Sequence, residues 1–199
     1  MGSPYQGFRA VLEILCLKLG VSMSKSFAVV VLAAFISGCS TYAADRYSIS
    51  ADNVTALRNV GSNQINVGEF TSTEPDLSVL TCRAVGPIKT PDGETFAEFV
   101  KEAFVSELKI AELYSPDGPV TLTGNLDEID FSSGSGTWNI ALTVDSSNGQ
   151  SISVREDYSF QTSFAGAVAC NQTAQALMPA VQDLIASLIA DPRFPDLIQ

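Results

Sequence analysis

Apolar and polar residues alternate along three stretches in the second half of the chain, a pattern typical of half-buried β-strands. The first stretch, 120–126, alternates in this way, and its phase slips before Ile129, which predicts a β-bulge. The alternation returns in the stretches 138–144 and 152–160. Because the turn signal Asn148-Gly149 separates these two, they are expected to form a hairpin. The three stretches together predict an antiparallel meander.

Two longer stretches follow the helical period instead. Apolar residues three and four positions apart form one stripe over residues 95–114, and Thr95-Phe-Ala-Glu98 is a capping box at its start. A second apolar stripe predicts a helix over residues 171–190. Pro179 lies inside that helix and is expected to kink or break it, since proline has no amide hydrogen to donate.

Short alternating stretches before residue 90 predict further strands at 47–51, 65–70 and 77–85, with one or two helical turns at 53–59. The order of elements is then strands, helix, three strands, helix. This order predicts an α+β fold, a two-layer sandwich in which two main helices pack on one face of an antiparallel sheet that includes the meander.

An uninterrupted apolar run, Phe27 to Ile36, follows Lys25 and is followed by small residues. Ten residues cover only about half of a bilayer core, so the run is too short for a membrane-spanning helix. It has the proportions of a secretory signal peptide that starts at Met23. There are two alternatives. The run could be an ordinary signal peptide that happens to contain a cysteine, or it could be a buried helix.

The run ends in Ile36-Ser37-Gly38-Cys39, which resembles the lipobox of bacterial lipoprotein precursors. The resemblance implies that Cys39 is lipidated and becomes the first residue after cleavage. The chain therefore divides into an upstream extension (1–22), a lipoprotein signal peptide (23–38), a tether (39–46) and a single periplasmic α+β domain (47–199). An additional amphipathic helix is the alternative for the first segment.

Charge and composition exclude several classes of function. The chain has 22 acidic and 11 basic residues and no histidine, with a net charge of −11. The absence of histidine excludes histidine-dependent nucleophilic catalysis and histidine-ligated zinc. Removal of residues 1–38 takes away three basic residues and one acid, so the mature chain has 21 acids, 8 bases and a net charge of −13. An acidic chain of this kind is not expected to bind nucleic acid.

The densest group of acidic residues is Asp127, Glu128 and Asp130, which we call the acidic cluster. A cation site and a paired-carboxylate catalytic site both suit such a cluster. Its spacing differs from an EF-hand loop, and it lies where a strand is expected to end, so solvated surface acids are the favoured interpretation. The sequence therefore predicts no catalytic residue, no cofactor and no metal ion.

Two cysteines remain once Cys39 is assigned to lipid and Cys16 to the upstream extension. Cys82 and Cys170 are then a pair in an oxidising compartment, and we expect them to form a disulfide between the sheet and the last helix. Two separate buried thiols are the alternative.

Four further stretches resemble a group of uncharacterised proteobacterial lipoproteins; they are Cys82-Arg-Ala-Val-Gly-Pro-Ile88, Phe96-Ala-Glu-Phe99, Thr121-Leu-Thr-Gly-Asn-Leu-Asp-Glu128 and Pro179-Ala-Val-Gln-Asp-Leu-Ile185. No activity is assigned to that group, so the resemblance implies none for this chain. The order of elements is also similar to that of small envelope lipoproteins that support outer-membrane assembly or lipid transport. By the sorting rule of known lipoproteins, Ser40 after the lipidated cysteine implies the outer membrane.

These observations favour a non-enzymatic accessory lipoprotein. We expect it to be anchored through Cys39 to the periplasmic face of the outer membrane and to bind an envelope protein or another envelope component. The alternative is a cell-wall enzyme that uses the carboxylates of the acidic cluster. A purely structural domain without a discrete binding site is a third possibility.

Overall fold

The computed structural model describes residues 41–199. The predicted upstream extension, the predicted signal peptide and Cys39 therefore lie outside the described residues. The elements in chain order are β1 (Tyr42–Ala43), α3 (Ala51–Val60), β2 (Ile65–Ser72), β3 (Val79–Cys82), β4 (Gly86–Lys89), α4 (Phe96–Ala111), β5 (Val120–Ser132), β6 (Thr137–Ser146), β7 (Ser151–Ser159), α5 (Gly166–Ala190) and α6 (Phe194–Leu197).

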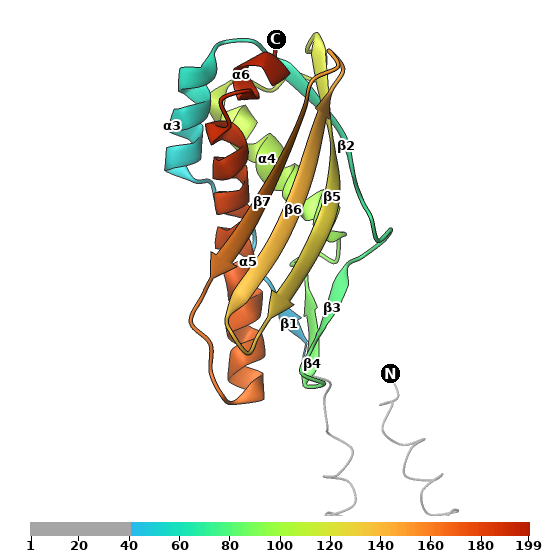
Figure 1. The fold of residues 1–199 in the computed structure, drawn as a ribbon, viewed down its shortest axis with the longest axis vertical. Coiled ribbons are helices and arrows are strands. Elements are labelled where there is room, and N and C mark those ends of the chain that lie inside the picture. The colour runs from blue at the N-terminus through green and yellow to red at the C-terminus, as the bar shows by residue number, and fades with distance from the viewer. Residues whose placement is uncertain (1–40) are drawn as a thin grey trace, which may run out of the picture. The chain divides into compact units, whose positions relative to one another are not determined.

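The main sheet has four strands in the order β2-β5-β6-β7 (Figure 1). Strands β5, β6 and β7 pair antiparallel, which confirms the predicted meander. Strand β2 pairs with β5 in parallel, so the sheet is mixed rather than wholly antiparallel. The reason is the connection, because the chain passes through α4 between β2 and β5, and parallel neighbours need such a crossover. A small second sheet has the order β1-β4-β3.

The helices form a layer on one face of the main sheet (Figure 1). Helix α5 packs against β6 and β7, and α4 packs against β2 and β5, which confirms the α+β two-layer sandwich. By length and composition α5 could cross a membrane, yet its residues Leu177, Val181 and Leu184 are wholly buried in the core. It is therefore the core helix of this domain.

Several local predictions are confirmed. The Thr95 side chain accepts a hydrogen bond from the amide of Glu98, and the Glu98 carboxylate accepts one from the amide of Thr95 at 2.8 Å, which completes the capping box of α4. The register of β5 against β6 shifts between Leu126 and Glu128, so the bulge lies where the phase of the pattern slips. Gly149 adopts φ +91° in the turn between β6 and β7.

The first strand and the tether differ from the prediction. Residues 47–50 connect β1 to α3, and α3 begins at Ala51 because Ser50 caps it by accepting a hydrogen bond from the amide of Asn53. The folded domain begins at Tyr42 rather than at residue 47, since β1 pairs with β4 and Ala44 is buried. A two-residue strand has no periodicity, so its sequence could not reveal this pairing.

Two other elements differ in extent. The predicted strand 77–85 contains β3 and a tight turn at Arg83-Ala84, where both residues have positive φ, and β4 follows from Gly86 to form a hairpin with β3. Helix α5 begins at Gly166 and runs through Pro179 to Ala190 as one element, so the expected break is absent. Burial of the neighbouring apolar residues against the sheet offsets the lost hydrogen bond.

A buried hydrogen bond and a disulfide also join α5 to the strands. The buried Trp138 of β6 donates a hydrogen bond from its indole nitrogen to the carbonyl oxygen of Thr173 on α5 at 2.9 Å. A disulfide joins Cys82, the last residue of β3, to Cys170 on α5, with their Cα atoms 5.9 Å apart. Both cysteines are fully buried. The disulfide therefore connects the small sheet to the helix that covers the main sheet.

We predict that loss of this disulfide lowers the free energy of unfolding. The bond closes a loop with a sequence separation of 88 residues, and in the chain-entropy relation such a loop stabilises the fold by roughly 4 to 5 kcal/mol. Urea denaturation of the Cys82→Ala/Cys170→Ala variant, compared with the oxidised parent, measures the change. A variant with an unchanged unfolding midpoint would show that the bond makes no contribution.

Candidate functional site

The acidic cluster lies at the bulge of β5. Asp127 is the extra residue there, because Leu126 pairs with Leu142 and Glu128 pairs with Ala141. Consecutive strand residues normally point to opposite faces, but the bulge brings Asp127 and Glu128 to the same face. That face is the one opposite α4 and α5, and we call it the outer face.

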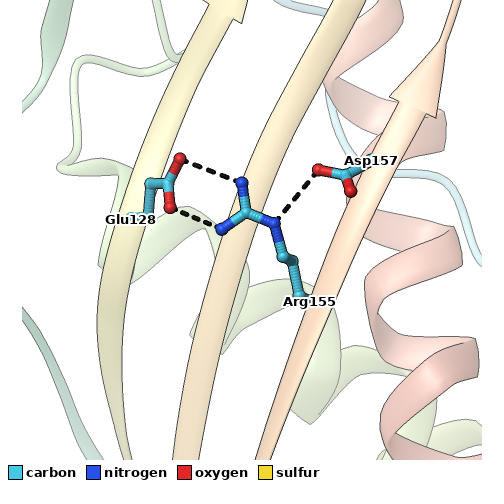
Figure 2. Close-up of polar contacts among 3 residues, drawn as sticks. All are labelled: Glu128, Arg155 and Asp157. Atoms are coloured by element: carbon cyan, nitrogen blue, oxygen red, sulfur yellow. Dashed lines mark hydrogen bonds and ion pairs between the residues drawn. The ribbon is translucent and has the colours of Figure 1, made fainter.

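Glu128 is held by an arginine from a strand that is not its neighbour. Arg155 of β7 donates two hydrogen bonds to the Glu128 carboxylate, at 2.6 Å and 3.2 Å, and its Nε lies 3.2 Å from Asp157 Oδ1 (Figure 2). Ala141 of β6 pairs with both Glu128 and Arg155, so it lies between them in the same row. Its small side chain lets the arginine extend over the middle strand.

Asp127 belongs to a second set of hydrogen bonds that crosses the sheet. Its carboxylate accepts hydrogen bonds from Asn125 Nδ2 at 2.6 Å and from Thr143 Oγ1 at 2.7 Å. Thr143 in turn contacts Ser153 on β7 at 2.8 Å, and Thr71 on β2 donates to Asn125 Oδ1 at 3.0 Å. This network therefore includes side chains from all four strands and orders the polar groups of the outer face.

The rest of the outer face is also polar. On β6 and β7 the outward residues are Thr137, Asn139, Ala141, Thr143, Asp145, Ser151, Ser153, Arg155, Asp157 and Ser159. Together with the acidic cluster these strands carry five carboxylates and one guanidinium group, so the face is acidic. Among residues 41–199, the helices lie on the opposite side of the sheet (Figure 1).

A shallow hollow of about 370 Å³ adjoins the cluster. Strand β2 leaves β5 after Ser72, where the Thr73 amide still donates to the Leu126 carbonyl oxygen at 3.1 Å, and the following segment, 74–80, does not pair with β5. Leu77 and Leu80 line one side of the hollow, and the acidic cluster lines the other. The hollow is therefore a continuation of the outer face with an apolar wall.

The electrostatics of the cluster differ from those of a catalytic carboxyl pair. The hydrogen bonds from Arg155 lower the pKa of Glu128 below its ordinary value, whereas a general acid needs a raised pKa. The Asp127 carboxylate accepts hydrogen bonds from a side-chain amide and a hydroxyl. Asp130 is exposed, and its backbone pairs with that of Asn139 on β6. Within residues 41–199 no three Asp, Glu or Cys side chains are grouped closely enough to hold a metal ion.

A second titratable group, which the sequence analysis did not identify, is buried between the helices. Glu107 of α4 is fully buried, and its Oε1 accepts hydrogen bonds from the Tyr47 hydroxyl, the Ser50 amide at 3.1 Å and Asn53 Nδ2 at 3.3 Å. Burial raises the pKa of the Glu107 carboxyl, although these hydrogen bonds act in the opposite direction. The signal was present in the sequence, because Glu107 lies seven residues after Val100 on the apolar stripe.

Glu107 joins the start of the domain to α4. Asn53 also donates to the carbonyl oxygen of Gln182 on α5 at 2.9 Å, so the hydrogen bonds around Glu107 link α3, α4 and α5. The second carboxylate oxygen, Oε2, is buried without a hydrogen-bond partner among the described residues. Burial of this oxygen without a partner disfavours the charged form, in line with the raised pKa of the Glu107 carboxyl. We interpret Glu107 as a structural group rather than as a reactive one.

We predict that the Glu128 carboxyl titrates below the ordinary range and that Arg155 is the cause. Arg155→Met keeps the aliphatic stem and removes the guanidinium group, so the pKa of Glu128 should rise toward its ordinary value. Carbon-13 NMR titration of the side-chain carboxyl measures it. Asp130→Asn is the control, because it leaves Arg155 in place and should leave the Glu128 titration low. An unchanged pKa in Arg155→Met would contradict the assigned cause.

We also predict that Glu107→Gln reduces the pH dependence of stability. Because the pKa of Glu107 is raised in the folded state, its contribution is fully present below the unfolded pKa and is lost as pH rises through the folded pKa. The glutamine resembles the protonated carboxyl, so the variant should gain on the parent as pH increases. Urea unfolding over a pH series measures this, with the exposed Glu102→Gln on the same helix as control. A pH-independent difference would refute the prediction.

The likeness of the whole chain to known proteins is weak. No family model matches it. No curated protein matches it either. A solved structure of a DUF330 protein from Xanthomonas campestris is similar at 10% identity and a TM-score of 0.48, over 75% of this chain and 95% of that one. A candidate lipoprotein from Caulobacter crescentus is similar at 14% identity and a TM-score of 0.24, over 70% and 93% of the two chains. Likenesses at these scores assign neither a family nor a function.

Proposed function

We propose that the mature chain is a lipid-anchored, non-enzymatic accessory protein of the bacterial envelope that binds a protein partner through its outer face. One observation carries the proposal. The outer face is an acidic, hydrogen-bonded surface of four strands, and the helices of the described domain leave it uncovered. A partner with basic side chains matches its charge.

The anchor is supported by the sequence. Ile36-Ser37-Gly38-Cys39 ends an apolar run of signal-peptide length, and the folded domain begins at Tyr42, three residues after Cys39. The acidic mature chain would be repelled by anionic headgroups, so attachment needs acyl chains. Ser40 supports outer-membrane sorting, and the periplasmic face is the side on which an exported domain with a disulfide would lie.

The geometry of the acidic cluster favours binding over catalysis. Glu128 is neutralised by Arg155, and Asp127 is tied into the network across the strands. Both arrangements fix side chains on a surface, as recognition requires, and the hydrogen bonds from Arg155 lower the pKa of Glu128, whereas a general acid needs a raised pKa. Only the proximity of the three acidic residues supports the alternative of a cell-wall enzyme.

A photo-crosslinking amino acid on the outer face tests the proposal. Placed at the exposed Thr123 of β5 in native envelopes, it should give a reproducible adduct with one protein, whereas the same group at the exposed Glu102 of α4 should not. Charge reversal by Asp127→Lys/Asp130→Lys should lower the adduct yield about tenfold or more. Glu102→Lys is the matched control and should leave the yield unchanged.

Equal adducts from both positions, or none from Thr123, would overturn the binding role. A complementation assay distinguishes the enzyme alternative from the binding role. It uses variants in which one carboxylate of the acidic cluster at a time is replaced by its neutral amide. Loss of one catalytic carboxyl costs about 10²- to 10⁴-fold in rate, whereas loss of one exposed interface charge costs no more than about fivefold. Mass spectrometry of the purified protein tests the anchor itself, and an unmodified Cys39 in the native host would end that part of the proposal.

A further inference from the structure

Three exposed apolar side chains gather at one end of the domain. Val85 follows the β3–β4 turn, Phe164 lies in the loop before α5, and Val168 is in the first turn of α5; their exposed fractions are 39%, 103% and 50%. A side-chain carbon of Val85 lies 3.0 Å from the position that a Cβ on Gly166 would occupy, so Val85 lies beside the start of α5, close to the chain segment that carries Phe164 and Val168. We call this group the apolar end. It lies at the lower end of the domain in Figure 1.

The loop that carries Phe164 is held rather than loose. Arg83 donates from Nε to Ser133 Oγ at 2.9 Å and from Nη2 to the Ser133 carbonyl at 2.6 Å, and its Nη1 lies 3.3 Å from the Phe164 carbonyl oxygen. Arg83 and Ala84 have φ values of 46° and 52°, which are costly for residues with side chains. Hydrogen bonds from Arg83 in this strained turn thus hold the loops of the apolar end in place.

The charge of the chain is distributed away from this end. The stretches on either side of its residues, 77–91 and 158–182, contain no aspartate or glutamate, and neither does 131–144, although the chain has 22 acidic residues. Arg83 and Lys89 are the charged residues in these stretches. An apolar surface without acids on an otherwise acidic domain is compatible with phospholipid headgroups, which repel the rest of the surface.

The start of the domain lies at the same end. Strand β1 runs parallel to β4, and Tyr42 pairs with Ile88, two residues after Gly86. Cys39 precedes Tyr42 by three residues, and an extended chain covers at most about 3.6 Å per residue. The point at which an acyl chain would be attached, Cys39, can therefore lie no more than about 11 Å from the first strand.

We propose that the apolar end is a membrane-contact surface, which seats Val85, Phe164 and Val168 in the interfacial region of a phospholipid bilayer. This inference rests on the proposed lipid anchor and specifies the orientation of the anchored domain. The anchor supplies the attachment, and the apolar end restricts rotation about the short connection. Such residues would lie about 5–10 Å deep, at the boundary of headgroups and acyl chains.

Tryptophan fluorescence tests the orientation in the full-length mature protein. Phe164→Trp replaces one exposed aromatic residue by another, so the fold is expected to be unaffected. Reconstituted in vesicles of phosphatidylethanolamine and phosphatidylglycerol, the new tryptophan should show blue-shifted emission and quenching by brominated lipids. Ile110→Trp is the matched control, because Ile110 is 51% exposed on α4, outside the apolar end. The buried Trp138 gives a common background that the parent spectrum removes.

Quenching at position 164 and none at position 110 would support the contact surface. Equal quenching at both positions, or none at either, would overturn it. A blue shift that depends on protein concentration without vesicles would assign the apolar end to a second copy of the chain and would also overturn it. Mass spectrometry of the same sample reports the lipid on Cys39, so a lipidated protein without quenching refutes the orientation while the anchor stands.

Discussion

The packing of α5 against the main sheet is the contact on which the rest of the structure depends. Its buried stripe covers β6 and β7, the Trp138 indole is bonded to its backbone at Thr173, and the disulfide at Cys170 attaches the small sheet to it. Once α5 lies on one face, the strand alternation requires polar residues on the other. The polar character of the outer face is thus a consequence of how the core is formed.

The proposed binding and membrane surfaces occupy different parts of one rigid arrangement. The strands of the main sheet run lengthwise from the apolar end toward the opposite end of the domain (Figure 1). With the apolar end against a bilayer, the outer face would extend away from the membrane and stay accessible to a partner. The short connection between Cys39 and Tyr42 suits this arrangement better than a long flexible tether would.

Local patterns predicted the features that depend on neighbouring residues. The capping box at Thr95, the bulge after Leu126 and the β6–β7 hairpin are each encoded within a few positions of the chain, so periodicity and turn residues were sufficient. The predictions failed where distant strands pair. Strand β1 is too short to show a period, and the parallel pairing of β2 with β5 depends on the crossover through α4.

The sequence by itself determined the fold class and the face on which the alternating apolar residues of the meander lie, because side-chain direction follows from alternation. Only the tertiary structure decided which polar groups meet. Arg155 reaches Glu128 because the register places Ala141 between them, and Glu107 meets Tyr47 and Asn53 because α3 packs against α4. Such contacts depend on strand order and helix packing, which no local pattern specifies, since they are set by the energy of the whole core.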